Sequence, residues 1–284
     1  MRRCHLIAAG LAAGTACARP APPADGPSVV IITATDYAFN APDTIPAGRT
    51  TFRLVNQGKE LHHASLVWLG DGKTIADFGA ALQAAMKNHG PPPAWASFAG
   101  GPNAVTPGDT ASATQLLEPG SYVLVCWIPT IDGTPHTMKG MMRAIVVIGA
   151  ATARPAEPAE PAPDVVVTLN DYDFQFARPL TAGRRTIRVE NAGPQAHEIV
   201  ITALPSGKTL QDFVAWEKGG EKGPLPTGRW LGGVATLDAG AHAQFTATFQ
   251  PGNYLLLWLL ARREGRPAAP GARDGEADHC NLGR

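Results

Sequence analysis

The sequence predicts an all-β protein of two tandem antiparallel β-sandwiches, with a short helix inserted in each. Short β-branched, aromatic or alternating runs, separated by glycine, proline and asparagine, are typical of sandwich strands. The same short motifs recur at a fixed offset along the chain. A length of 284 residues with 44% hydrophobic side chains is enough for two buried cores.

The predicted strands and helices lie in the same order in both halves of the chain. In the first half, strands are predicted at 28–34, 51–55, 64–69, 111–116, 122–126 and 143–148. Ile75, Phe78, Leu82 and Met86 recur at helical spacing, which predicts an amphipathic helix over 74–88. A weaker equivalent in the second half spans 209–216.

The internal repeat sets the expected domain boundaries. Pairs of identical residues 135 positions apart are Asp36 and Asp171, Asn56 and Asn191, Gly58 and Gly193, His62 and His197, and Gly72 and Gly207. After a length change, 119–122 matches 251–254 at an offset of 132. We therefore expect a first domain at 27–149, an Ala/Pro/Glu linker at 150–163 and an incomplete second domain at 164–260, followed by an aberrant tail at 261–284.

The first 18 residues have the pattern of an export signal. Arg2 and Arg3 precede an apolar stretch over 6–16, and small residues follow. Cys17 lies at the expected cleavage site, and in an alternative interpretation it carries a lipid anchor. This pattern predicts a periplasmic or extracytoplasmic protein. No other apolar run reaches the roughly 18 residues of a membrane span.

Charge argues against a nucleic-acid partner, because 24 basic residues balance 24 acidic ones. Cys4 and Cys17 belong to the signal, which leaves Cys126 and Cys280 in the folded part. So few cysteines do not indicate a disulfide framework.

A set of residues in the first half resembles a known family. Asn56, Gly58 and His62 are followed by Cys126, His136 and Met141, with Gly140 before the methionine. This order is similar to the ligand order of plastocyanin- and azurin-type cupredoxins, which are Greek-key β-sandwiches that bind blue copper. The resemblance implies one type 1 copper ion in the first domain, with His62, Cys126 and His136 as equatorial ligands and Met141 as the axial ligand.

The chemistry of copper explains these residue types. Two imidazoles and a thiolate with a weak thioether hold both Cu(I) and Cu(II) with little rearrangement. One feature departs from the family pattern: nine residues, 127–135, separate Cys126 from His136. The familiar proteins have only a few residues there.

Each ligand also has a structural alternative. His62 and its neighbour His63 could both be loop residues, and the repeat selects His62 because it aligns with His197. Cys126 could be a small core residue or could form a disulfide with Cys280. The side chains Met138, Met141 and Met142 could fill the sandwich core.

The second half departs from the first near its end. Trp258 stands where the first half has Cys126, and the following segment is not expected to supply a final strand. One hypothesis is a single-base insertion at the codon of Trp258, because the tail can be back-translated in the next frame into residues similar to 129–141, which belong to the ligand loop (127–141) of the first half. The alternative is a genuinely divergent tail.

These observations predict an exported type 1 copper-binding protein that transfers electrons or holds copper, without substrate turnover. Its partner would be an unidentified redox or copper-delivery protein. One alternative is a metal-free binding or scaffold module. Another is a two-domain copper oxidoreductase. Such enzymes usually have a histidine directly beside the cysteine ligand, whereas Cys126 has Val125 and Trp127 as neighbours, and the chain contains no His-x-His pair.

Overall fold

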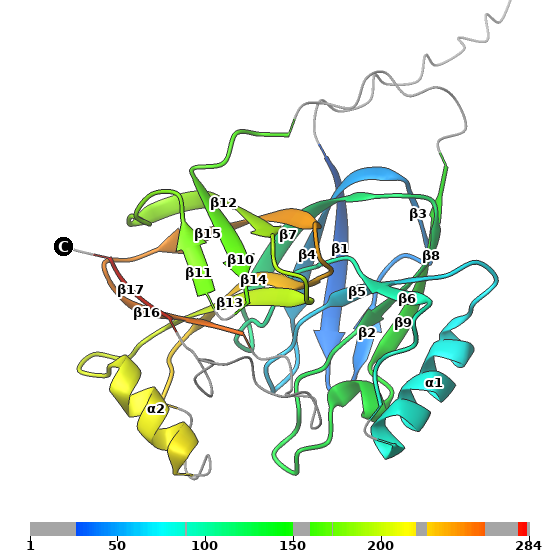
Figure 1. The fold of residues 1–284 in the computed structure, drawn as a ribbon, viewed down its shortest axis with the longest axis horizontal. Helices are drawn as coiled ribbons and strands as arrows, with labels where there is room; N and C mark the ends of the chain where they lie inside the picture. The colour runs from blue at the N-terminus through cyan, green and yellow to red at the C-terminus, as the bar shows by residue number, and fades with distance from the viewer. Residues whose placement is uncertain are drawn as a thin grey trace, which may run out of the picture.

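The computed structural model describes residues 27–88, 90–149, 160–171, 173–219 and 226–258, together with the backbone of 278–282. The predicted signal with Cys17, most of the predicted linker and much of the predicted tail lie outside the described residues. Figure 1 shows the chain as two neighbouring groups of strands, with one α-helix at each side of the molecule. Among the described residues, no helix has the length and apolar character needed to cross a bilayer.

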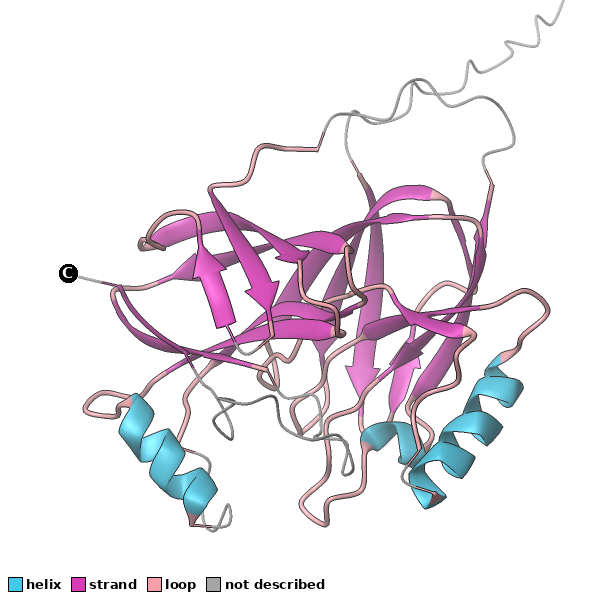
Figure 2. Cartoon of the chain, viewed as in Figure 1, coloured by secondary structure: helices cyan, strands magenta, loops and turns pink. Residues whose placement is uncertain are grey.

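Strands make up most of the regular secondary structure of the described chain (Figure 2). The N-terminal half contains β1 (Ser28–Thr35), β2 (Ala38–Asn40), β3 (Thr44–Pro46), β4 (Gly48–Asn56), β5 (Ser65–Leu69), α1 (Ile75–Lys87), β6 (Ala96–Phe98), β7 (Thr110–Leu117), β8 (Gly120–Val125), the 3-10 helix η1 (His136–Lys139) and β9 (Met142–Ile148). The C-terminal half contains β10 (Val165–Asn170), β11 (Asp173–Phe176), β12 (Gly183–Asn191), β13 (His197–Ala203), α2 (Leu210–Lys218), β14 (Trp230–Leu237), β15 (His242–Phe249), β16 (Gly252–Leu257) and β17 (Asp278–Leu282). The all-β prediction with one helix in each half is confirmed.

The two halves share one sheet. Its strand order is β11-β10-β12-β15-β7-β4-β1-β2, and the halves join where β15 pairs with β7 through Gln244 and Thr114. A five-stranded sheet, β3-β9-β8-β5-β6, faces the N-terminal part. A four-stranded sheet, β14-β13-β16-β17, faces the C-terminal part. Hydrogen bonds therefore continue from one half of the chain into the other.

The sheets are mixed, which corrects the expectation of purely antiparallel pairing. β1 runs parallel to β4, β10 parallel to β12, and β3 parallel to β9. The physical reason is connectivity: β2 returns antiparallel to β1, the chain crosses to the facing sheet as β3, and it comes back beside β1 as β4. Two reversals separate β1 from β4, so these strands point the same way.

A second correction concerns the C-terminal tail. β17 pairs antiparallel with β16, from Gly252 opposite Leu282 to Leu256 opposite Asp278. The composition of the tail, rich in arginine, alanine, glycine and proline, predicts no final strand there. A sheet ladder uses backbone N–H and C=O groups, so an extended segment of ordinary composition can cover an exposed edge.

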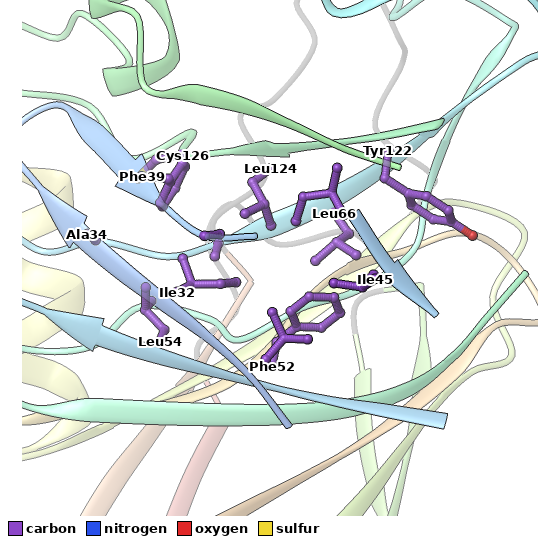
Figure 3. Close-up of a cluster of buried hydrophobic side chains, with 14 of the residues drawn as sticks. Ile32, Ala34, Phe39, Ile45, Phe52, Leu54, Leu66, Tyr122, Leu124 and Cys126 are labelled. Carbon is purple, nitrogen blue, oxygen red and sulfur yellow. The ribbon is translucent and has the colours of Figure 1, made fainter. Parts of the chain in front are cut away.

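The main core of the N-terminal half lies between its two sheets. Along β4, Thr50, Phe52, Leu54 and Asn56 point inward in alternation, as the two-residue period of a strand requires. Figure 3 labels Cys126 and Phe39 at one end of this hydrophobic cluster and Tyr122 at the other. Cys126 is therefore embedded in the end of a well-packed core.

Helix α1 covers the outer face of the five-stranded sheet. Phe78 and Leu82, one turn apart, are buried against Val67 and Val123. The helix begins after Thr74, whose hydroxyl accepts the N–H of Asp77 while the Asp77 carboxylate accepts the N–H of Thr74. The helix predicted from apolar spacing is confirmed.

Candidate metal centre

Three of the predicted ligands come together at the end of the N-terminal core. Cys126 Sγ lies 3.5 Å from His136 Nδ1 and 3.9 Å from His62 Nδ1. The two Nδ1 atoms are 3.2 Å apart. All three side chains are fully buried. Within the described residues they form the one group of histidine, cysteine and acidic side chains that could hold a metal ion.

The Asn-x-Gly turn before His62 places its imidazole. Asn56, at the inward end of β4, donates through Nδ2 to the carbonyls of Glu60 and Val105, and its Oδ1 accepts the Gly58 N–H. A side chain at position 58 would collide with the Asp36 carboxylate and the His62 ring. Glycine is therefore needed because the backbone passes directly over the histidine.

The long loop between Cys126 and His136 folds back on itself. The Thr130 N–H donates to the Thr134 carbonyl, and the His136 N–H donates to the Ile128 carbonyl at 2.9 Å. The Thr137 N–H donates to the Cys126 carbonyl at 2.8 Å. These hydrogen bonds hold the two ends of the loop together, so Cys126 and His136 stay adjacent although nine residues separate them.

Both histidines direct their second nitrogen to a carboxylate. His62 Nε2 lies 2.7 Å from Asp36 Oδ1, and His136 Nε2 lies 2.9 Å from Glu60 Oε2. Tyr37 donates to the other oxygen of Glu60 at 2.8 Å, which raises the pKa of Tyr37 to about 12. A carboxylate on the outer nitrogen orients a ligating imidazole and raises its basicity. Each Nδ1 is therefore turned toward the sulfur.

Burial controls the protonation of the ligands. Burial lowers the pKa of His62 against the opposing effect of Asp36, and nearby His136 lowers it further. Burial also raises the pKa of the Cys126 thiol to about 12, although the N–H groups of His63 and Ile128 partly offset this. These shifts favour neutral imidazole at His62 and a protonated thiol at Cys126, so a cation that binds there would displace the thiol proton.

The other residues considered as ligands or partners of Cys126 lie in different places. Met141 is fully buried in the same cluster as Cys126, and its backbone contacts both neighbouring ligands: its N–H donates to the His136 carbonyl and its carbonyl accepts the Cys126 N–H. Met138 and Met142 instead pack on the opposite side of the sheet, under α1. Both ring nitrogens of His63 are engaged elsewhere, Nδ1 with Asn103 Oδ1 and Nε2 with the Trp127 N–H, and His63 is not in the candidate metal-binding group. Cys126 is a free thiol, so it does not form a disulfide with Cys280.

The C-terminal half retains only part of this arrangement. His197 Nε2 lies 2.8 Å from Asp171 Oδ1, which reproduces the contact between His62 and Asp36. Gly193 passes over this pair as Gly58 does in the first half. Trp258 occupies the space beside His197, with ring centroids 4.6 Å apart.

The residues of the N-terminal site fit copper. Both Nδ1 atoms and the sulfur lie within 4.8 Å of one another, in a pocket closed to solvent. Two imidazoles and a thiolate form the donor set that copper electron-transfer sites use. The outer nitrogens are already engaged, so the inner nitrogens need no reorientation to bind an ion.

Comparisons with known proteins return structures of blue copper proteins. A reduced auracyanin from Roseiflexus castenholzii is 24% identical, with 43% of this chain and 99% of that chain covered and a TM-score of 0.29. Auracyanin A from Chloroflexus aurantiacus is 20% identical, with coverage of 43% and 100% and a TM-score of 0.29. A blue copper oxidase from Nitrosomonas europaea is 16% identical, with coverage of 83% and 80% and a TM-score of 0.26.

No family model matches the chain, and no curated protein matches it. All three TM-scores are below 0.5, and the evidence for a metal site is the geometry of His62, Cys126 and His136 itself.

Sequence reasoning did not single out the partners of the ligands. Asp36 and Glu60 hold the two imidazoles, and His63 accepts the N–H of Trp127. Asp36 could have been found, because it begins a motif that returns at Asp171 together with the histidine. Glu60 has no equivalent in the second half, where position 195 is glutamine, so the repeat carries no signal for it.

Proposed function

We propose that this chain is an exported copper protein of the cupredoxin type, in which His62, Cys126 and His136 bind one copper ion and Met141 is the axial ligand. It transfers electrons or holds copper without turning over a substrate. A redox or copper-delivery protein is its partner. The convergence of His62 Nδ1, His136 Nδ1 and Cys126 Sγ in one buried pocket carries this proposal.

Burial of the ligands favours electron transfer over catalysis. All four proposed ligands are fully buried, so a substrate has no direct access to them. The donor atoms lie together and are held by hydrogen bonds from outside the pocket, which keeps the rearrangement between Cu(I) and Cu(II) small. A tryptophan rather than a histidine follows Cys126, so the chain has no direct covalent bridge from the cysteine to a second histidine ligand.

Export is proposed from the first 18 residues alone, with their paired arginines, apolar stretch and small residues before the cleavage site. An oxidising compartment would convert an unprotected thiol to a disulfide or a sulfenic acid. Burial and metal ligation together would protect Cys126.

An optical titration with Cu(II) tests the proposal. The purified chain should develop a strong thiolate-to-copper absorption band in the visible range, saturating at one equivalent. Cys126→Ser should abolish the band, whereas the control His197→Gln, at the matched histidine of the C-terminal half, should leave it unchanged. Absence of the band in a folded wild-type protein would refute type 1 copper binding and favour a metal-free module.

A further inference from the structure

A chain of three hydrogen bonds, two of them buried, connects Trp127, the residue after Cys126, to the C-terminal half. The N–H of Trp127 donates to His63 Nε2 at 2.8 Å. His63 Nδ1 lies 3.2 Å from Asn103 Oδ1, and Asn103 Nδ2 lies 3.1 Å from Glu198 Oε2. The side chains of His63, Asn103 and Glu198 are all buried. The chain thus crosses from one half to the other without passing through solvent.

The direction of the first two hydrogen bonds follows from their donors. A backbone N–H can only donate, so His63 Nε2 accepts from Trp127 and carries no proton. His63 Nδ1 therefore carries the proton and donates to Asn103 Oδ1. The neutral imidazole has a single tautomer in this arrangement.

Asn103 uses all of its polar atoms. Its Oδ1 also accepts the N–H of Ala104, and its Nδ2 lies within hydrogen-bond distance of the carbonyls of Ile199 and Val234 in the C-terminal half. Because each of these groups is buried, moving Asn103 would leave several of them without partners. The C-terminal half therefore determines where Oδ1 of Asn103 lies, and with it the ring of His63.

His63 acts on the cysteine from two directions. Its side chain holds the N–H of Trp127, and its own backbone N–H approaches the Cys126 sulfur together with that of Ile128. Residues beside the site also contact the C-terminal half, because Leu61 and Ile128 pack against a cluster that contains Trp230 and Phe213. The end of β8 and the start of the ligand loop are thus held from the neighbouring half.

We propose that Asn103 and Glu198 are positioning residues, through which the C-terminal half fixes the Cys126 thiol and the start of the ligand loop. The C-terminal half, which has Trp258 in place of the cysteine, then positions residues of the metal site in the N-terminal half. The role of the thiol as a copper ligand rests on the proposed function, but the positioning itself requires no metal.

The reactivity of the thiol in the metal-free protein tests this positioning. In a full chain with Cys4, Cys17 and Cys280 replaced by serine, only Cys126 can react with the disulfide reagent DTNB, and it must become exposed to do so. Asn103→Leu should accelerate the reaction by about tenfold, the change in local opening expected from the loss of a hydrogen bond.

Arg229→Ala is the matched control. It removes another link between the halves, the pair of bonds from Arg229 to Asp109 at 2.8 and 2.9 Å, which lies outside the buried chain. Its reaction rate should stay within about twofold of the parent. Equal acceleration by both variants would show that general weakening of the interface exposes the thiol, and would overturn the proposal.

A measurement on the unmutated protein remains decisive if Asn103→Leu does not fold. Nitrogen-15 NMR of the imidazole should show His63 with its proton on Nδ1, and the Trp127 amide should exchange slowly with solvent. A proton on Nε2, or rapid exchange at Trp127, would refute the hydrogen-bond chain.

Titration with Cu(II) separates this inference from the proposed function. A shifted thiolate-to-copper band in Asn103→Leu, with an unchanged band in Arg229→Ala, would extend the positioning to the loaded site. If the wild-type chain forms no band but the thiol kinetics and the tautomer are as expected, copper binding is refuted and the positioning stands.

Discussion

The indole ring of Trp258 meets the imidazole ring of His197 edge to face, with centroids 4.6 Å apart and planes at 83°. His197 is otherwise placed like His62, since its Nε2 lies 2.8 Å from a carboxylate oxygen of Asp171. Tryptophan has only an N–H donor and offers no lone pair to a metal. The C-terminal half thus keeps a histidine in the ligand orientation with an aromatic ring in place of the sulfur.

This contact predicts one copper ion per chain. Metal analysis after Cu(II) loading and removal of excess ion should give about one equivalent, because one soft ligand set is complete among the residues that the structure describes. His197→Ala should leave the stoichiometry unchanged, and His62→Ala should lower it. A second tightly bound equivalent, lost in His197→Ala, would contradict the prediction.

Met141, the proposed axial ligand, should tune the reduction potential. Met141→Leu replaces a thioether with an apolar group of similar volume in a fully buried position. Loss of the weak donor destabilises Cu(II) more than Cu(I), so the potential should rise, by ~59 mV for each tenfold change in relative affinity. Met138→Leu, on the other side of the sheet, is the control for protein voltammetry and should leave the potential unchanged.

The carboxylate of Glu60 should favour the more highly charged copper ion. Its Oε2 lies 2.9 Å from His136 Nε2, so Glu60→Gln removes a negative charge beside a ligand. The reduction potential should rise by on the order of 100 mV, the interaction of one charge across several ångströms at an effective dielectric constant of about 20. Asp43→Asn, an exposed partner of Arg143, is the control. A potential that stays the same in Glu60→Gln would show that solvent screens this charge.

The ligand loop should depend on the ionisation of Asp132. The Thr130 hydroxyl and the Thr134 N–H donate to its carboxylate and lower its pKa from 3.8 to about 2. The ionised form is therefore favoured by the folded loop. The stabilisation of the folded loop by the ionised Asp132 carboxylate is complete above about pH 3.8 and is lost as the pH falls toward 2.

A carbon-13 NMR titration of the Asp132 carboxyl group checks this pH dependence. The midpoint in the folded protein should lie near 2, and Thr130→Val, which lacks the hydroxyl donor, should move it toward 3.8. A midpoint near 3.8 in the unmutated chain would show that, in solution, Thr130 and Thr134 do not donate hydrogen bonds to the Asp132 carboxylate.

The capping box of α1 should contribute to stability. Thr74 Oγ1 accepts the Asp77 N–H at 3.2 Å, and the Asp77 carboxylate accepts the Thr74 N–H at 2.9 Å. Thr74→Ala should lower the free energy of unfolding by about 1 kcal/mol in urea denaturation, whereas Thr74→Ser should preserve most of it. Equal losses in both variants would point to the methyl group instead of the hydroxyl.

Local pattern was sufficient to predict six of the nine strands of the N-terminal half and the helix of each half. Two-residue alternation indicated β4, β7 and β9, and apolar spacing of three and four residues indicated α1. The repeat selected His62 over His63, and the structure places His62 with Cys126 and His136. These features depend on residue types at short spacing or on comparison of one half with the other.

Other features were decided only by the tertiary structure. The parallel pairing of β1 with β4, the junction of β7 with β15, and the pairing of β17 with β16 depend on which backbone edges meet after the chain has crossed between sheets. The contact of Glu60 with His136 and that of Asn103 with Glu198 join residues 76 and 95 positions apart. No periodic pattern records such contacts, because a polar side chain acquires its partner only when packing excludes water and brings two distant segments together.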